Sequence, residues 1–237
     1  MGIYNHIPLN EDFNNWWYFG RRKALSYKIN KYSKVEKEKM NILEIGPGTG
    51  TNILELQNFG KVDILEIDEY FIELISKNKQ LRINNIFNSF KEINKTYDLV
   101  VILDVLEHVE NTKIFLDDIY SILENNGVLI ISVPAHESLF SEHDILLKHY
   151  KRYSKKTLKD ELKDIFFLKE FFWYNFLLFP IRYIQIKFSK NTNSDTSVGS
   201  LLNFVLKLII KIELIFIKFG IKTPAGISLF CVATKKE

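Results

Sequence analysis

The chain has 237 residues, 46% of them hydrophobic and 26% charged, which suits one domain with a full core and argues against disorder. The formal net charge of +3 is too small to indicate a nucleic-acid partner. The lone cysteine, Cys231, excludes an internal disulfide and a cysteine-based zinc site, and it fits a reducing cytoplasm.

From Met40 onward, apolar runs typical of buried strands alternate with helical patterns. Strands are predicted at residues 41–45, 61–68, 85–87, 97–103 and 127–133. Helices are predicted at residues 51–59, 69–78 and 112–123. This alternation predicts a parallel sheet covered on both faces. Ligands bind such sheets at the edge formed by the carboxyl ends of the strands, so the loops after these strands carry the site.

A glycine-rich turn, EIGPGTG, joins the first predicted strand to the first predicted helix. Gly46, Gly48 and Gly50 let the backbone turn sharply and approach a ligand closely, and the helix N-terminus adds free N–H donors. The spacing differs from the dinucleotide-binding G-x-G-x-x-G, and the acid before it, Glu44, would repel a pyrophosphate. That carboxylate instead suits a cation such as the ammonium of a methionine moiety.

Two acids follow the second predicted strand. We expect Asp68, 22 positions after Gly46, to lie at the ligand edge within reach of ribose hydroxyls. Glu66 is a lesser candidate, because side chains alternate along a strand and it should point to the opposite face. Asp68 is also placed to cap the helix predicted at 69–78.

The chain resembles the class I S-adenosylmethionine-dependent methyltransferases of the small-molecule group in three segments, ILEIGPGTG, LEID and YDLVVILDVLEHV. The resemblance implies their Rossmann-like fold, a doubly wound and mostly parallel seven-stranded sheet, with a helical N-terminal lid and a C-terminal helical insertion. It also implies their cofactor, S-adenosylmethionine, which becomes S-adenosylhomocysteine. In that family the glycine loop holds the methionine part of the cofactor, and the acid after the second strand holds its ribose.

The same resemblance assigns two more loops at the ligand edge. Asn88 and Ser89, after the third strand, stand where the family holds adenine. Asp104 and His108, after the fourth strand, belong to a segment that lies beside the sulfonium in the family. We expect His108 to orient this loop or to line the site.

The segment NWWYFGRR at residues 15–22 resembles a lid in a narrower group of bacterial methyltransferases. The resemblance implies that Tyr18 covers the methionine chain and that Arg21 pairs with its carboxylate. An amphipathic helix that docks its aromatic side chains on the core is an equally open interpretation.

A second segment, PAHESLFSEHDILLKHYKRY, resembles the loop after the fifth strand in the same group. We expect Asp144, Arg152 and Tyr153 to face the substrate, because the loop follows a strand at the ligand edge. His149 is the candidate general base, since imidazole titrates near neutral pH. No cysteine lies near the histidines of this loop, so we expect no metal.

Residues 201–219 predict an apolar helix with one polar stripe, formed by Ser200, Asn203, Lys207, Lys211 and Lys218. It either packs across the domain as a core or dimer helix, with the stripe in water, or lies in a membrane interface together with the aromatic residues 166–188. We therefore expect a hydrophobic or lipid-linked acceptor, or peripheral contact with the inner face of the membrane. A homodimer is the alternative.

The chain shows no pattern for export or for a membrane span. Its first residues lack a basic stretch followed by an apolar one, so we expect no signal peptide. No uninterrupted apolar run reaches the ~20 residues that a membrane-spanning helix needs. A cytoplasmic protein is therefore expected.

These features predict a methyltransferase that acts on a hydroxyl of a small-molecule, glycan or lipid-linked acceptor. Two alternatives stay open, an N-methyltransferase acting on a small molecule and a non-catalytic cofactor-binding module in a complex. We expect one domain, 1–237, made of a helical lid (1–40), a cofactor-binding core (41–133), a substrate side of loop and apolar helices (134–225) and a final strand (226–235).

Overall fold

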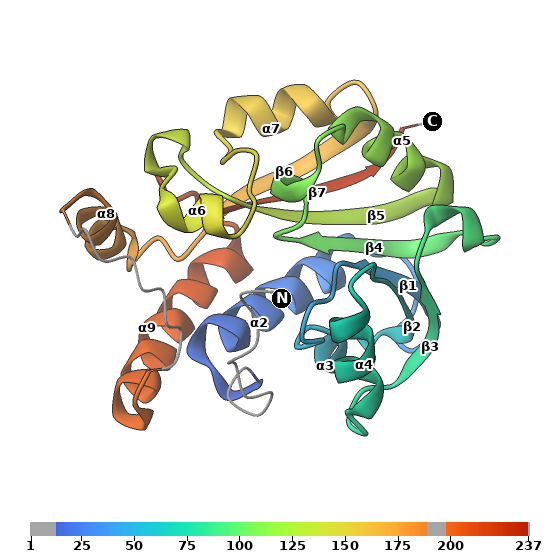
Figure 1. The fold of residues 1–237 in the computed structure, drawn as a ribbon, viewed down its shortest axis with the longest axis horizontal. Helices are drawn as coiled ribbons and strands as arrows, with labels where there is room; N and C mark the ends of the chain where they lie inside the picture. Colours follow the sequence, from blue (N-terminus) through green and yellow to red (C-terminus); the bar gives the residue numbers. More distant parts are fainter. Residues whose placement is uncertain (1–12, 189–197, 237) are drawn as a thin grey trace.

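A sheet of seven strands runs through the computed structural model, which describes residues 13–188 and 198–236 (Figure 1). The strands lie in the order β3-β2-β1-β4-β5-β7-β6. The first five pair in parallel, whereas β7 runs antiparallel between β5 and β6. The predicted α/β class and mostly parallel sheet are thus confirmed. The strands are β1 (Met40–Ile45), β2 (Gly60–Leu65), β3 (Ile83–Phe87), β4 (Tyr97–Leu103), β5 (Leu123–Pro134), β6 (Phe166–Tyr174) and β7 (Ser228–Lys235).

Helices cover both faces of the sheet, and short 3-10 turns form parts of the loops at its edges. The α-helices are α2 (Trp16–Tyr32), α3 (Ile53–Leu56), α4 (Glu69–Lys77), α5 (Thr112–Ile122), α6 (Glu142–Leu146), α7 (Lys155–Leu162), α8 (Phe179–Phe188) and α9 (Ser200–Phe219). The 3-10 turns are η1 (Phe90–Glu92), η2 (Leu106–His108) and η3 (Glu137–Leu139). The helical lid expected over residues 1–40 is represented by α2, and residues 1–12 lie outside the described residues.

The central strands are buried on both faces, because helices pack on each side. On one face, Ile42 of β1 lies in a cluster with Leu25 of α2 and Ile210 of α9. On the other face, Leu43 of the same strand lies in a cluster with Leu116 of α5. Consecutive residues of one strand therefore both enter a core, which explains why the predicted strands are continuous apolar runs.

The aromatic segment expected to contribute apolar helices begins instead with strand β6, which pairs with β7. The pairing register shifts between Leu168 and Glu170, as at a β-bulge. A bulge interrupts the alternation of side chains between the two faces of a strand. The segment consequently lacks the period of two that marks a strand in a sequence, and only its later part, α8, is helical.

The polar stripe of α9 is divided between solvent and α2, since Ser200, Lys211 and Lys218 are exposed whereas Asn203 and Lys207 contact α2. The side-chain oxygen of Asn203 accepts a hydrogen bond from the backbone N–H of Trp16 at 2.8 Å, and Lys207 lies over the ring of Phe19. The exposed apolar side chains of the helix are Leu201, Leu202, Phe204, Val205, Leu208, Ile212, Ile215 and Phe219. Within the described residues, no helix is both long and apolar enough to cross a membrane.

Gly20 permits the close approach of α2 to α9 and β6. A Cβ atom at this position would lie 2.3 Å from Cγ2 of Ile210 and 2.4 Å from the hydroxyl oxygen of Tyr174. Both distances are far shorter than a van der Waals contact, so a larger residue would push the elements apart. The absence of a side chain at Gly20 therefore fixes how α2 lies against its neighbours.

Candidate cofactor and acceptor site

The glycine turn after β1 has the left-handed backbone that favours glycine. Its φ angles are +65° at Gly46, +55° at Gly48 and +79° at Gly50. A Cβ atom at Gly46 would lie 2.6 Å from Cγ2 of Val105, whereas a Cβ atom at Gly48 would meet nothing within 4 Å. Gly46 is therefore constrained by packing, and Gly48 borders open space that a ligand can occupy.

Glu44, the last but one residue of β1, is buried with one oxygen unpartnered. Its Oε1 accepts a hydrogen bond from the side-chain amide of Asn52 at 2.7 Å, while Oε2 has no hydrogen-bond partner. Burial raises the pKa of Glu44 to about 7. A buried polar oxygen without a partner is unfavourable, and an ammonium group of a ligand would satisfy it. The predicted role of Glu44 fits this geometry.

Glu66, rather than Asp68, lies against the glycine turn. Its Oε1 accepts hydrogen bonds from the backbone N–H groups of Ile67 and Asp68 at 2.8 and 3.0 Å, and its carboxylate interacts with the backbone of Gly48. The exposed Asp68 caps α4 by accepting from the N–H of Tyr70 at 2.9 Å. Because β2 ends at Leu65, strand alternation does not set the direction of Glu66, which lies closer to the glycine turn than the sequence predicts.

Asn88 and Ser89 follow β3 at the same edge of the sheet, as expected. The hydroxyl of Ser89 caps η1, and the backbone N–H of Asn88 donates to the Glu92 carboxylate at 3.0 Å. The side chain of Asn88 is exposed. These contacts order the loop and leave the Asn88 amide available to a ligand.

Helix α2 is tied to the edge of the sheet by an ion pair. A guanidinium nitrogen of Arg21 lies 2.7 Å from Oδ2 of Asp104, whose Oδ1 accepts from the hydroxyl of Ser132 at 2.9 Å. The ring of Tyr18 lies 4.9 Å from the guanidinium carbon of Arg21. The structure therefore brings Tyr18, Arg21 and Asp104 together, with Arg21 paired to a protein carboxylate.

The carboxylate of Asp144 is buried among partners from its own loop. Its Oδ1 lies 2.8 Å from both Nδ1 of His149 and Nε of Arg152, and its Oδ2 accepts from the backbone and the hydroxyl of Ser141. Burial alone would raise the pKa of Asp144, but hydrogen bonds from His149 and Arg152 hold it well below its usual range. The buried Asp144 carboxylate thus links three residues of this loop, Ser141, His149 and Arg152, through hydrogen bonds.

The three side chains expected to face the substrate lie buried instead. Asp144 and Tyr153 are fully buried, and Arg152 is 8% exposed. Arg152 also donates to the carbonyl of Ala135, and Tyr153 donates to that of Leu106. A loop over a sheet edge must pair its own polar groups, and these side chains serve that purpose.

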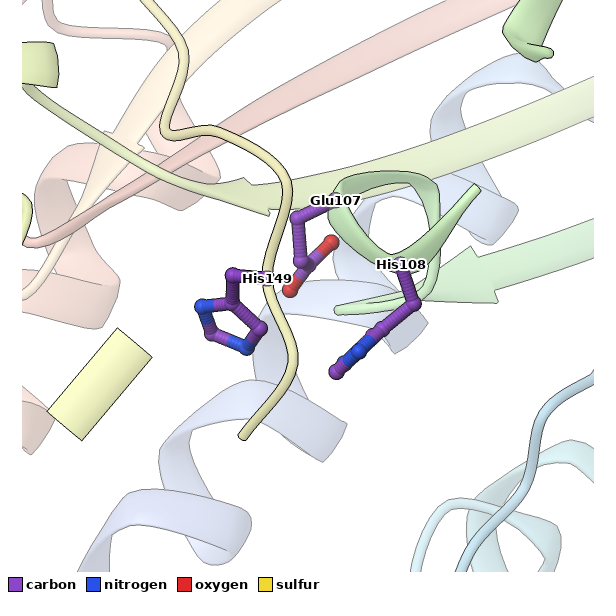
Figure 2. Close-up of side chains that lie close together, drawn as sticks. All are labelled: Glu107, His108 and His149. Atoms are coloured by element: carbon purple, nitrogen blue, oxygen red, sulfur yellow. The ribbon is translucent and has the colours of Figure 1, made fainter. Parts of the chain in front are cut away.

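Glu107 and two histidines form a polar cluster at the carboxyl end of β4. Figure 2 shows the Glu107 carboxylate between the rings of His108 and His149, which come from η2 and from the loop after α6. The two ring centroids are 4.6 Å apart at an interplanar angle of 78°. One oxygen or nitrogen atom from each of the three side chains lies within 4.8 Å of the others. Glu107 was not among the residues predicted from the sequence, although it directly precedes the candidate His108 at the ligand edge.

The carboxyl group of Glu107 is shielded from solvent in this cluster. Glu107 is 1% exposed, and neither of its oxygens has a hydrogen-bond partner. Burial raises the pKa of Glu107 well above its usual range, and the nearby Asp104 adds to this effect. Its neutral form is therefore favoured.

Residues 10–165 match the protein family described as a methyltransferase domain. The chain belongs to this family of S-adenosylmethionine-dependent methyltransferases. The open space at Gly48 and the unpartnered oxygen of Glu44 fit that cofactor. The family match ends just before β6, so β6, α8, α9 and β7 lie outside it.

Two curated relatives of this methyltransferase are named as O-methyltransferases. A ubiquinone biosynthesis O-methyltransferase of Rickettsia typhi is 27% identical over 136 residues, covering 50% of this chain and 55% of the relative. A malonyl-[acyl-carrier protein] O-methyltransferase of Ilyobacter polytropus is 25% identical over 180 residues, covering 70% of this chain and 67% of the relative. The chain thus spans only about half the length of the first of these proteins.

Solved structures of low identity share the fold of this methyltransferase. The N-methyltransferase NodS from Bradyrhizobium japonicum, in complex with S-adenosylhomocysteine, superposes with a TM-score of 0.57 at 13% identity. The superposition covers 92% of this chain and 86% of NodS. This similarity supports the methyltransferase fold over most of the chain.

Proposed function

We propose that this methyltransferase transfers the methyl group of S-adenosylmethionine to a hydroxyl oxygen of its acceptor, with His149 as general base. The observation that carries the proposal is the contact of His149 Nδ1 with the buried Asp144 at 2.8 Å. Because Nδ1 is engaged, Nε2 is the ring nitrogen left to take a proton. A hydroxyl acceptor needs such a base, whereas a neutral amine does not.

The reaction is an in-line displacement at the methyl carbon. When bound, S-adenosylmethionine would supply an activated methyl group, which the acceptor oxygen would take as the carbon–sulfur bond breaks and leaves its electron pair on sulfur. The hydroxyl proton passes to Nε2 of His149. The cofactor already activates the methyl group, so the chain contributes mainly orientation and exclusion of water.

In this proposal, the residues around the glycine turn contact different parts of the cofactor. Glu44 pairs with its ammonium group, and Glu66 replaces Asp68 as the acid that binds the ribose hydroxyls. The support for Glu66 is its contact with the backbone of Gly48 and its low exposure of 7%. Asn88 and Ser89 border the adenine.

The lid residues cover the methionine end of the cofactor. Tyr18 and Arg21 of α2 lie at the same edge of the sheet as Asp104. When the cofactor is bound, the guanidinium group of Arg21 can pair either with Asp104 or with the cofactor carboxylate, because either carboxylate can accept its hydrogen bonds. This arrangement supports α2 as the cover of the site.

We further propose that the acceptor is hydrophobic or lipid-linked and that the enzyme reaches it at the inner face of a membrane. The support is the apolar exposed side of α9, together with exposed Ile181 and Ile184 of α8. Lys211 and Lys218 lie exposed on α9, where they can meet anionic head groups. A homodimer that buries the same surface is the competing outcome.

Labelled S-adenosylmethionine incubated with a bacterial lipid extract tests the reaction. We expect an O-methylated product, and we expect His149→Ala to lower turnover by about 10²–10⁴-fold. Binding of S-adenosylhomocysteine, measured by calorimetry, should survive this change. His143→Ala, in the same loop, is the matched control and should keep most of the turnover. An N-methylated product, or full turnover by His149→Ala, would contradict the proposal, and no product would favour a non-catalytic module.

A further inference from the structure

We infer that Glu107, His108 and His149 form the subsite that holds the reacting hydroxyl oxygen of the acceptor, with Glu107 as a second catalytic residue beside the base. The inference rests on the proposed O-methylation. It assigns a role to Glu107, an acid at this edge that the sequence does not single out.

The size of the cluster fits an oxygen atom. One oxygen or nitrogen atom from each side chain lies within 4.8 Å of the others, so a single atom placed between them lies at most about 2.8 Å from each, which is within hydrogen-bond distance of an oxygen. The same spacing also admits a metal ion, which the experiment below tests with Zn²⁺. The arrangement in Figure 2 therefore places all three side chains within reach of one hydroxyl group.

The burial of Glu107 gives an independent argument. Its carboxyl group is 1% exposed, and both oxygens lack a hydrogen-bond partner. Buried polar atoms in native proteins are nearly always paired, so an unpaired carboxyl directed at two imidazoles indicates a missing ligand. The acceptor hydroxyl supplies the partner.

The protonation states of Glu107 and His108 are consistent with this chemistry. Burial favours the neutral form of Glu107, and burial together with the neighbouring His149 lowers the pKa of His108. A neutral carboxyl donates a hydrogen bond to the acceptor oxygen while His149 accepts the hydroxyl proton. An ionised Glu107 would instead repel the negative charge that develops on that oxygen.

Asp144 is a positioning residue in this arrangement. It holds Nδ1 of His149, and it is itself held by Arg152 and Ser141. Fixing one ring nitrogen determines which tautomer the imidazole has and where Nε2 points. The buried residues of the loop thus aim the base at the space beside Glu107.

The subsite is tested with phenol as a hydroxyl probe and toluene as its apolar counterpart. Both are titrated into the full chain loaded with S-adenosylhomocysteine, and the ring ¹⁵N signals of its histidines are followed by NMR. We expect phenol to shift the signals of His108 and His149 saturably and toluene to shift neither. The absence of a saturable phenol shift, or a shift that appears only with added Zn²⁺ after EDTA treatment, would overturn the inference.

Variants of Glu107 test whether its carboxyl group holds the hydroxyl group of the probe. Glu107→Leu should weaken phenol binding by about tenfold or more, because it removes the hydrogen bond. Glu107→Gln keeps a neutral donor and should stay within about threefold of the unmodified chain. The exposed neighbour Glu110 supplies the controls, Glu110→Leu and Glu110→Gln, which should change nothing.

The outcomes separate this inference from the proposed function. Unchanged phenol affinity in Glu107→Leu overturns the subsite, whatever product the enzyme makes. If Glu107→Leu does not fold, a loss greater than tenfold in Glu107→Gln overturns the donor role. An N-methylated product from the labelled extract overturns the O-methylation proposal even where the phenol shifts are present.

Discussion

At the scale of single residues, the burial of Glu44 links cofactor affinity to pH. Burial raises its pKa to about 7, so the group is mostly neutral at pH 6 and mostly ionised at pH 7.5. Only the ionised form attracts an ammonium group. The affinity for S-adenosylhomocysteine should therefore rise by up to about eightfold between these pH values. Calorimetric titration of S-adenosylhomocysteine at the two pH values measures this change in affinity.

The control for this pH effect is Glu44→Gln, which keeps the hydrogen bond with Asn52 but cannot ionise. It should bind the cofactor weakly, with little change over the same range. Arg21 and Glu66 also interact electrostatically with Glu44 and remain in the variant. An equal rise of affinity in the variant would assign the pH dependence to one of those groups and contradict the role of Glu44.

Substitutions of the two acids after β2, Glu66 and Asp68, should have different effects on cofactor binding and on stability. Glu66→Ala should reduce cofactor binding at least about tenfold, since it removes both the contact with the turn and the proposed ribose ligand. Asp68→Ala should keep cofactor binding and lower the free energy of unfolding by about 1 kcal/mol, because it removes a helix cap. Calorimetry and chemical denaturation measure the pair, and the reverse result would restore Asp68 as the ribose ligand.

The sequence predicts which residues lie near the site better than it predicts where they point. The glycine turn and the position of Glu44 follow from backbone chemistry that glycine alone permits. The directions of Asp144 and Glu107 depend on packing between η2 and the loop after β5, which brings together residues distant in sequence. No local sequence pattern reports that packing, so Asp144, which was expected to face the substrate, is buried, and Glu107, which was not singled out, lies between two histidines.

At the scale of elements, continuous apolar runs correctly predict the buried strands of the sheet. Periodicity is less informative for α9. It shows that Asn203 and Lys207 share a stripe, but it does not say whether that stripe faces water or α2. Strand β6 was also not predicted from the sequence. The bulge near Lys169 interrupts the alternation of side chains between the two faces of the strand, and a strand assignment depends on that alternation.

The contact between α2 and α9 can be tested through Gly20. Gly20→Ala places a methyl group within 2.4 Å of Ile210 and Tyr174, so the helices must separate. We expect a loss of about 1–3 kcal/mol in the free energy of unfolding, measured by denaturant titration. Gly199→Ala is the matched control, because its Cβ meets nothing within 4 Å. Equal stability of the two variants would contradict this packing.

At the scale of the whole molecule, the cofactor part and the apolar part are separate in sequence. The family match covers residues 10–165, which include the glycine turn and the histidine loop. The exposed apolar side chains of α8 and α9 come later in the chain (Figure 1). A surface of this kind is unfavourable in water unless a membrane, a partner or a second copy covers it.

Flotation with vesicles of phosphatidylglycerol and phosphatidylethanolamine at physiological salt tests the membrane proposal. We expect the full chain to float with the vesicles, because the apolar side of α9 enters the interface and its lysines meet the anionic head groups. Replacing Leu208, Ile212 and Ile215 together by glutamate should abolish flotation. Ile114→Glu, an exposed position on α5 at the opposite face of the sheet, should leave flotation unchanged. A full chain that stays unbound and forms a dimer by light scattering would assign the apolar surface to a second copy instead.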